Sequence, residues 1–209
     1  MPRPNRLQPD GSFLATPARG RFTGNRGILH DAAGRMGRAR WRHKAWITCT
    51  IRPRPGRPPL PMEAPGHYTP LFFLDEAVAC AAGHRPCALC RRAAYDAFRA
   101  AWGRAFGATP RAAGIDAILH AARIAPATRA QRRILRPADS LPTGAFILWQ
   151  GRAHLIRDGM ALPHAPDGYA PARPLPQGPV TVLTPAPMLA VMAAGWRPAL
   201  TAAEDRPGW

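Results

Sequence analysis

Two cysteines separated by two residues, Cys87 and Cys90, are the residues of this chain best suited to metal chemistry. Pro86 comes directly before them, and a helical pattern of apolar residues follows, so the pair lies at a turn that opens a helix. A turn of this kind can direct both sulfurs toward one tetrahedral ion. The spacing therefore predicts half of a zinc site.

The other ligands must come from more distant parts of the chain. Cys49 lies in a β-rich segment, residues 46–51, which predicts a strand that carries a third ligand. Three histidines could supply the fourth ligand: His43, His67 and His84. The spacing favours His67, from a separate strand, or His84, which forms His-x-x-Cys-x-x-Cys, without choosing between them. Four protein ligands would make a structural site, whereas three ligands and a water could make a catalytic one.

The cysteine pair ends a longer block, residues 71–92, with the sequence LFFLDEAVACAAGHRPCALCRR. Four features of this block match one known pattern without a gap: the paired phenylalanines at 72–73, the Ala-Ala-Gly at 81–83, the Arg-Pro-Cys at 85–87, and Cys90. This block resembles the zinc-binding domain of the Ada-type methylphosphotriester DNA repair proteins. The resemblance implies a zinc-bound module and a context of DNA repair or modification.

The chain also differs from that family. The family has an earlier Cys-x-x-x-Cys pair, and one of its cysteines accepts the methyl group, whereas here Cys49 is followed four residues later by Pro53. The family's Phe before Arg-Pro-Cys is His84. We therefore expect a shared module rather than a shared reaction, with alkyl transfer to a zinc-bound Cys49 thiolate as an alternative. Cys80 is expected to be a small buried apolar residue.

The charge of the chain is strongly unbalanced. It has 29 Lys and Arg against 12 Asp and Glu, a net charge of +17, which attracts polyanions and above all nucleic acid. A single lysine among the basic residues indicates a bias toward Arg codons, but that bias does not explain the excess of positive charge. Trp41 and Trp46 alternate with basic residues and could stack on bases; the competing interpretation is a solvated surface. The expected nucleic-acid contacts are Arg26, Arg38, Arg40, Arg42, Lys44, Arg85, Arg91 and Arg92.

A second set of residues could act as general acids and bases. His30 and Asp31 are adjacent in sequence, and Asp116 and His120 lie one helical turn apart on a predicted helix. Together they could hold a divalent metal or catalyse hydrolysis of nucleic acid, as in a nuclease or glycosylase. The competing interpretation is that each histidine bonds a neighbouring carboxylate in a structural role.

Several function classes are excluded by the sequence. No Walker loop, dinucleotide fingerprint or zinc-protease motif is present, and the absence of His-x-Glu excludes cytidine-deaminase chemistry. Four cysteines do not make a disulfide framework at this length. No apolar run approaches the roughly 20 residues of a membrane span, and the N-terminus lacks the apolar core of a signal peptide. We therefore expect a cytoplasmic protein.

The predicted fold class is α+β, in three parts. Residues 1–20 are expected to form a basic flexible arm, 21–136 a small Ada-like zinc-bound module with following helices, and 137–209 a β-rich lobe packed on that core. The predicted helices cover residues 75–83, 91–102, 112–124 and 187–194, and residues 128–136 are compatible with another helix. The predicted strands cover residues 46–51, 67–73 and 180–184, and a hairpin is predicted over 145–156.

The leading hypothesis is a zinc-containing protein that binds nucleic acid, DNA rather than RNA, in repair or modification. The first alternative is a hydrolase centred on His30, Asp31, Asp116 and His120. The second is a zinc-stabilised interaction protein whose charge serves only solubility.

Overall fold

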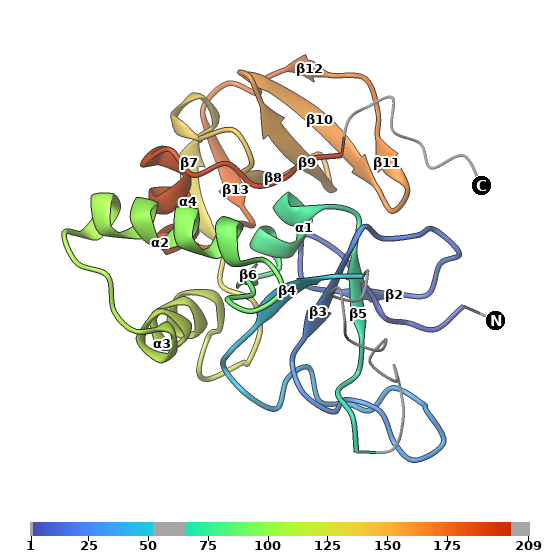
Figure 1. The fold of residues 1–209 in the computed structure, drawn as a ribbon. Coiled ribbons are helices and arrows are strands. Elements are labelled where there is room, and N and C mark those ends of the chain that lie inside the picture. Colours follow the sequence, from blue (N-terminus) through green and yellow to red (C-terminus); the bar gives the residue numbers. More distant parts are fainter. Residues whose placement is uncertain (1, 52–65, 202–209) are drawn as a thin grey trace.

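The computed structural model describes residues 2–51 and 66–201. Within these residues it contains four α-helices and two β-sheets (Figure 1), which confirms the predicted α+β class. The helices are α1 (Glu76–Ala81), α2 (Arg92–Phe106), α3 (Ala112–Arg123) and α4 (Ala186–Ala193), and a short 3-10 helix, η1, covers Ala138–Ser140.

The first sheet holds the segments that contain the cysteines. Its strand order is β2-β1-β5-β3-β4-β6, with β1 parallel to β5 and β4 parallel to β6. Arg6 and Leu7 of β1 are buried in this sheet, which differs from the flexible arm expected over residues 1–20. The strands are β1 (Arg6–Leu7), β2 (Phe13–Leu14), β3 (Phe22–Asn25), β4 (Ile47–Thr50), β5 (Leu71–Phe73) and β6 (Arg85–Pro86).

The second sheet is a largely antiparallel meander from the last third of the chain. Its order is β11-β10-β9-β8-β13-β7, and β12 pairs with β10. The hairpin predicted over 145–156 is present as β8 and β9. The strands are β7 (Ile134–Pro137), β8 (Phe146–Trp149), β9 (Arg152–Arg157), β10 (Met160–Ala165), β11 (Gly168–Tyr169), β12 (Arg173–Pro174) and β13 (Pro179–Val182).

The two sheets share one core. Figure 1 shows α1 between them, with α2, α3 and α4 gathered along one side of the molecule. Phe73 of the first sheet and Phe146 and Leu155 of the second belong to the same buried cluster. A second cluster joins the helices, where Phe98 and Trp102 of α2 pack with Trp196 after α4. The aromatic residues of α2 that these contacts involve are therefore buried.

Two stretches differ from the sequence prediction. The helix expected to end at residue 102 continues through Gly103 to Phe106, because the ring of Phe106 packs 4.8 Å from that of Trp102 and Gly107 supplies the left-handed C-cap. Residues 134–136, part of the stretch 128–136 that was compatible with a helix, instead belong to β7 because they pair with β13. The first difference rests on contacts within the helix and at its cap, whereas at the second a tertiary pairing outweighs local propensity.

Helix α1 is fixed at both ends by its own sequence. Asp75 caps its first turn by accepting a hydrogen bond from the Val78 amide at 2.9 Å. The same carboxylate accepts a hydrogen bond from the Tyr169 hydroxyl at 2.7 Å, which links α1 to the second sheet. Burial raises the pKa of Asp75. Gly83 follows the helix with φ +87°, a left-handed conformation that glycine adopts without strain after a helix end.

Replacing Gly83 with alanine is expected to destabilise the protein strongly. A side chain at φ +87° is strained, and a Cβ there would overlap the Arg123 side chain. Gly151→Ala is the matched control, because Gly151 also has positive φ but has no atom within 4 Å of the added Cβ. The control should lose about 1–2 kcal/mol of unfolding free energy from backbone strain alone, and Gly83→Ala clearly more, as measured by urea denaturation. Equal losses would contradict the close packing of Arg123.

Candidate metal centre

Three cysteine thiols converge at one edge of the first sheet. The sulfurs of Cys49, Cys87 and Cys90 all lie within 4.8 Å of one another, and this is the one such group of potential metal ligands among the described residues. All four cysteines of the chain are free thiols. A metal ion could be bound by this group.

Strand pairing brings the cysteines together. Strands β4 and β6 run parallel with Thr48 opposite Pro86, and the Cys87 amide donates to the Thr48 carbonyl at 3.0 Å. Cys49 follows Thr48 and Cys87 follows Pro86, so the two cysteines lie side by side. The chain then turns toward α2, where the Arg91 amide donates to the Cys87 carbonyl at 3.1 Å. This turn returns Cys90 to the same point.

The site favours negative charge on the sulfur of Cys87. The Leu89 amide donates a hydrogen bond to the Cys87 sulfur at 3.4 Å. Hydrogen bonding from Cys49 and then Cys90 lowers the pKa of Cys87, and the same shared proton raises the pKa of Cys49. Three sulfurs this close cannot all be thiolates without a cation between them, because like charges at this distance repel. The arrangement fits a soft cation.

Tyr68 is a neighbour of the site that the sequence analysis did not identify. Its side chain is half-buried, and desolvation, followed by the nearby charges of Cys49, Cys90 and Cys87, raises the pKa of its phenol. Tyr68 lies 19 positions before Cys87 in the sequence. No spacing rule links the two, so only the fold could reveal the proximity.

The two histidines predicted as ligands lie outside the cysteine group, as far as the described residues show. The ring of His84 is fully buried, packs edge-on against Phe73 at 4.7 Å and accepts a hydrogen bond from Arg26 Nε at 3.3 Å. Burial lowers the pKa of His84 well below its usual value. His67 is exposed at the start of the segment that leads to β5. Cys80 is fully buried in the helical core, as expected.

The residues predicted as general acids and bases are held by separate partners. Asp116 forms a buried bidentate ion pair with Arg85, with N–O distances of 2.7 and 2.8 Å. Asp31 is exposed and pairs with Arg35.

The two predicted histidines have separate partners as well. The Nδ1 atom of His30 lies 2.6 Å from the Thr69 hydroxyl oxygen, while His120 packs beside Trp41 and Trp46. Within the described residues, the predicted acids and bases form no common group of metal ligands. Their catalytic role stays a prediction.

The basic residues predicted to contact nucleic acid fall into two groups. Arg26 is buried. Arg85 forms a buried ion pair with Asp116, and Arg91 forms one with Glu76. The charges of Arg85 and Arg91 are therefore neutralised inside the protein. Arg92 is exposed but pairs with Asp96. The others are exposed on the segment before β4: Arg38, Arg40, Arg42 and Lys44.

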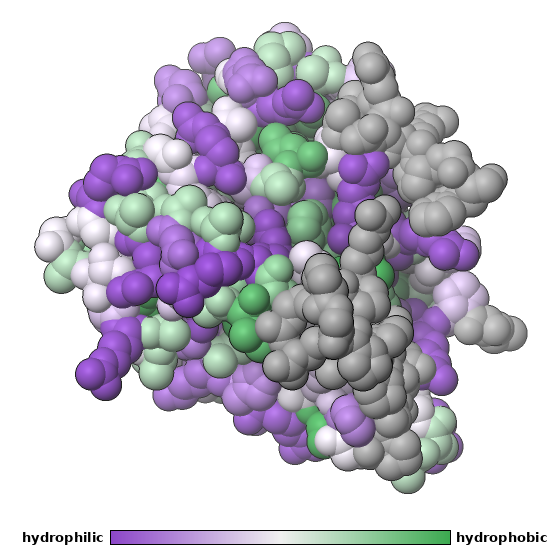
Figure 2. Space-filling view, viewed as in Figure 1, coloured by the Kyte–Doolittle hydropathy of each residue, from purple (hydrophilic) through white to green (hydrophobic). Residues whose placement is uncertain are grey.

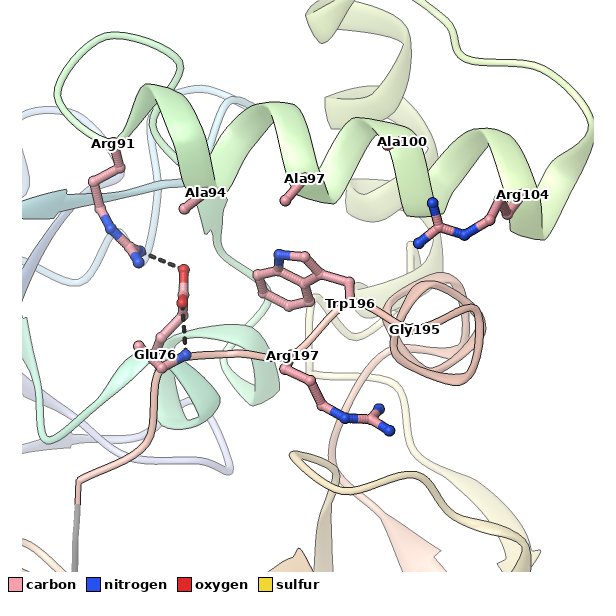
Figure 3. Close-up of a pocket in the computed structure, with 10 residues that line it drawn as sticks. Glu76, Arg91, Ala94, Ala97, Ala100, Arg104, Gly195, Trp196 and Arg197 are labelled. Carbon is pink, nitrogen blue, oxygen red and sulfur yellow. Dashed lines mark hydrogen bonds and ion pairs between the residues drawn. The ribbon is translucent and has the colours of Figure 1, made fainter.

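A cavity of about 400 Å³ lies between α2 and the segment after α4 (Figure 3). Ala94, Ala97 and Ala100 of α2 point toward Trp196, and Glu76 accepts hydrogen bonds from Arg91 and from the Ala199 amide. The carboxylate of this cavity is therefore already paired.

The fold and the site define an α+β protein with a three-cysteine group that could hold a metal ion. Comparison with protein-family models, with curated proteins and with solved structures found no match for the chain. Across residues 2–51 and 66–201, every helix is too short or too polar to cross a lipid bilayer.

Proposed function

We propose that this is a zinc-containing protein that binds nucleic acid and acts in DNA repair or modification. The observation that carries the proposal is the convergence of the thiols of Cys49, Cys87 and Cys90. Thiolates prefer Zn²⁺ over hard cations, and two strands joined through one ion make a compact module.

Zinc at this site would be held by the three cysteines and would have one further position. That position suits a water molecule or another ligand. The ion would supply positive charge that neutralises the thiolates and would cross-link β4 to the turn after β6. The protein's own part is to set the sulfur positions through strand register and to stabilise the Cys87 thiolate by the Leu89 amide.

Charge supports nucleic acid as the partner. The chain carries a net charge of +17, and Arg38, Arg42 and Lys44 are exposed on one continuous segment. Figure 2 shows hydrophilic residues spread over the face that carries α2 and α3. Guanidinium and ammonium groups such as those of residues 38–44 neutralise phosphates and release condensed counterions.

The context of DNA repair or modification comes from the resemblance of residues 71–92 to the Ada-type zinc domain. In the fold this block runs through β5, α1, β6 and the cysteine turn into the start of α2. It therefore contains the turn that supplies two of the three thiols, together with the core of the first sheet.

Binding of a labelled DNA strand is expected to weaken steeply with salt. In a plot of log K against log salt concentration, the magnitude of the negative slope should fall by roughly one for each phosphate contact removed. The double variant Arg38→Gln, Lys44→Gln should thus lower the slope by about two, whereas Arg173→Gln on β12 should leave it unchanged. Fluorescence anisotropy over a KCl series measures this. Absence of binding at low salt, or affinity independent of salt, would overturn nucleic-acid binding.

A further inference from the structure

A second cavity, of about 530 Å³, opens between the β1–β2 turn, the segment before β4 and the residues that follow α3. Its wall is basic and aromatic, and we call it the arginine groove. It is defined by Arg26, Arg40, Trp41, Arg123, Arg129 and Arg133. Of these, Arg26 and Arg40 were predicted to contact nucleic acid and Trp41 to stack on bases, whereas Arg123, Arg129 and Arg133 were not predicted as contacts.

The floor of the groove holds two buried guanidinium groups. Arg26 and Arg123 are 3% and 1% exposed. Arg26 donates to the Ala82 carbonyl at 2.7 Å and to His84, and Arg123 donates to the carbonyls of Gly83 and Lys44.

Neither buried arginine has a carboxylate within ion-pair distance in the described part of the chain. The Nε atom of Arg123 is buried without a hydrogen-bond partner. Carbonyl oxygens satisfy some of the N–H groups but do not neutralise the charge.

Two buried positive charges without a directly paired carboxylate are costly, although the charge of Asp116 offsets part of the cost at Arg123. Burial lowers the pKa of Arg123 to about 9 and that of Arg26 well below its usual value, and the charge of Arg123 lowers the latter further. An anion in the groove would offset both the desolvation and the mutual repulsion. Such a pair is typical of a site whose ligand brings negative charge.

The rim of the groove adds further positive charge. Arg40, Arg129 and Arg133 are exposed at its edge, and a single carboxylate, Asp10, faces them along the described lining. Asp10 accepts hydrogen bonds from the amide and the hydroxyl of Ser12, at 2.9 and 2.6 Å, and so stabilises the β1–β2 turn. The local balance remains strongly positive.

Of the two tryptophans that line the groove, only Trp41 offers it a planar surface. Trp46 is buried, and the guanidinium carbons of Arg26 and Arg123 lie 3.5 and 3.6 Å from its ring centre, so Trp46 is not the stacking surface that its sequence context indicated. Trp41 is only half-buried, and its ring lies 4.8 Å from the guanidinium carbon of the exposed Arg129. A planar ligand could take the place of this exposed cation or stack beside it.

We propose that the arginine groove binds a single nucleotide, with its phosphate on the arginines and its base against Trp41. This deepens the proposed function, on which it rests, by assigning the site where one nucleotide unit is held. The volume lies within the roughly 300–1,000 Å³ usual for small-ligand pockets. Stacking on an aromatic ring accepts any base, at about 1–3 kcal/mol for each base.

The test is calorimetric titration of the folded protein with AMP and, separately, with inorganic phosphate. The wild type should bind AMP more tightly than phosphate. Trp41→Ala should weaken AMP binding by about 5- to 100-fold, the equivalent of one stacked base, and leave phosphate binding unchanged. Arg129→Gln should weaken both. Arg173→Gln on β12, which removes the same charge outside the groove lining, should change neither.

Circular-dichroism melting of each variant separates loss of binding from loss of folding. Because Trp41 and Arg129 are not fully buried, their variants are expected to melt near the wild type. Equal affinity for AMP and phosphate that Trp41→Ala does not alter would overturn the base contact. No AMP binding by the folded wild type would overturn the proposal altogether.

Competition with a labelled DNA strand distinguishes a nucleotide within a strand from a free one. Displacement of the strand by AMP, lost in Trp41→Ala, supports the groove as a strand-binding site. AMP binding without any DNA binding would support a free-nucleotide site and overturn the proposed nucleic-acid function. DNA binding that Trp41→Ala and Arg129→Gln leave intact, without AMP binding, would overturn the groove and keep the function.

Discussion

Replacing Cys87 with serine is expected to abolish metal binding and to cause a large loss of stability. Cys87 is the central thiol, because it is next to Cys49 across the strand pair and its sulfur accepts the Leu89 amide. Serine keeps the size of the side chain but supplies a poor zinc ligand. Metal content by mass spectrometry should fall from about one zinc per chain to none. Because bound zinc contributes about 10–16 kcal/mol in small structural sites, its loss should also lower the free energy of unfolding strongly.

Cys80→Ala is the matched control for this experiment. Cys80 is fully buried in the helical core and is not part of the cysteine group. This variant should keep its zinc while losing only the small contribution of a buried sulfur to packing. Zinc loss in Cys87→Ser together with a lower melting temperature supports a structural ion. Zinc loss without unfolding supports a catalytic ion, and alkylation of Cys49 would be the next reaction to test. A wild type free of metal would contradict the zinc site.

Asp116→Ala is expected to have the second largest effect, about 3–5 kcal/mol of unfolding free energy, because it leaves a buried charge unpaired. The side chains of Arg85 and Asp116 are 5% and 7% exposed and are joined by two hydrogen bonds. The loss would also remove a carboxylate whose charge favours the protonated form of Arg123. Urea denaturation measures the loss.

The double variant Arg85→Met, Asp116→Leu tells whether this pair is structural. Replacing a buried ion pair by apolar residues of similar size is often neutral, so the double variant should recover most of the stability lost in Asp116→Ala. His120 keeps its place beside Trp41 and Trp46 in both variants. A variant that folds fully and loses only a hydrolytic activity would instead restore Asp116 to the catalytic role predicted from the sequence.

The cysteine turn shows how far local sequence could go. Cys87 and Cys90 are close because a short turn joins them, and Pro86 before it and the helix after it, both readable from sequence, place that turn correctly. Cys49 was a sound candidate because strand 46–51 was readable from its β-rich residues. The register of β4 on β6, which brings Cys49 beside Cys87, is a pairing across 38 positions and was not readable.

The histidines and arginines show where local sequence fails. A buried His84 and an exposed His67 look equally suitable as ligands in sequence, because burial depends on packing against Phe73 and Arg26. Arg85 and Arg42 look alike in the same way, yet the first is neutralised by Asp116 and the second is exposed. Partners from distant segments decide which charges reach the surface.

The sequence by itself determined the α+β class, the caps of α1, the cysteine turn and the excess of positive charge, since each depends on residue type and on spacing within a few residues. Only the tertiary structure decided that β1 joins the first sheet, that three thiols meet, and that Arg26, Arg123 and Trp41 line one groove. The physical reason is that these arrangements depend on strand register and on burial, which are properties of the whole packed core.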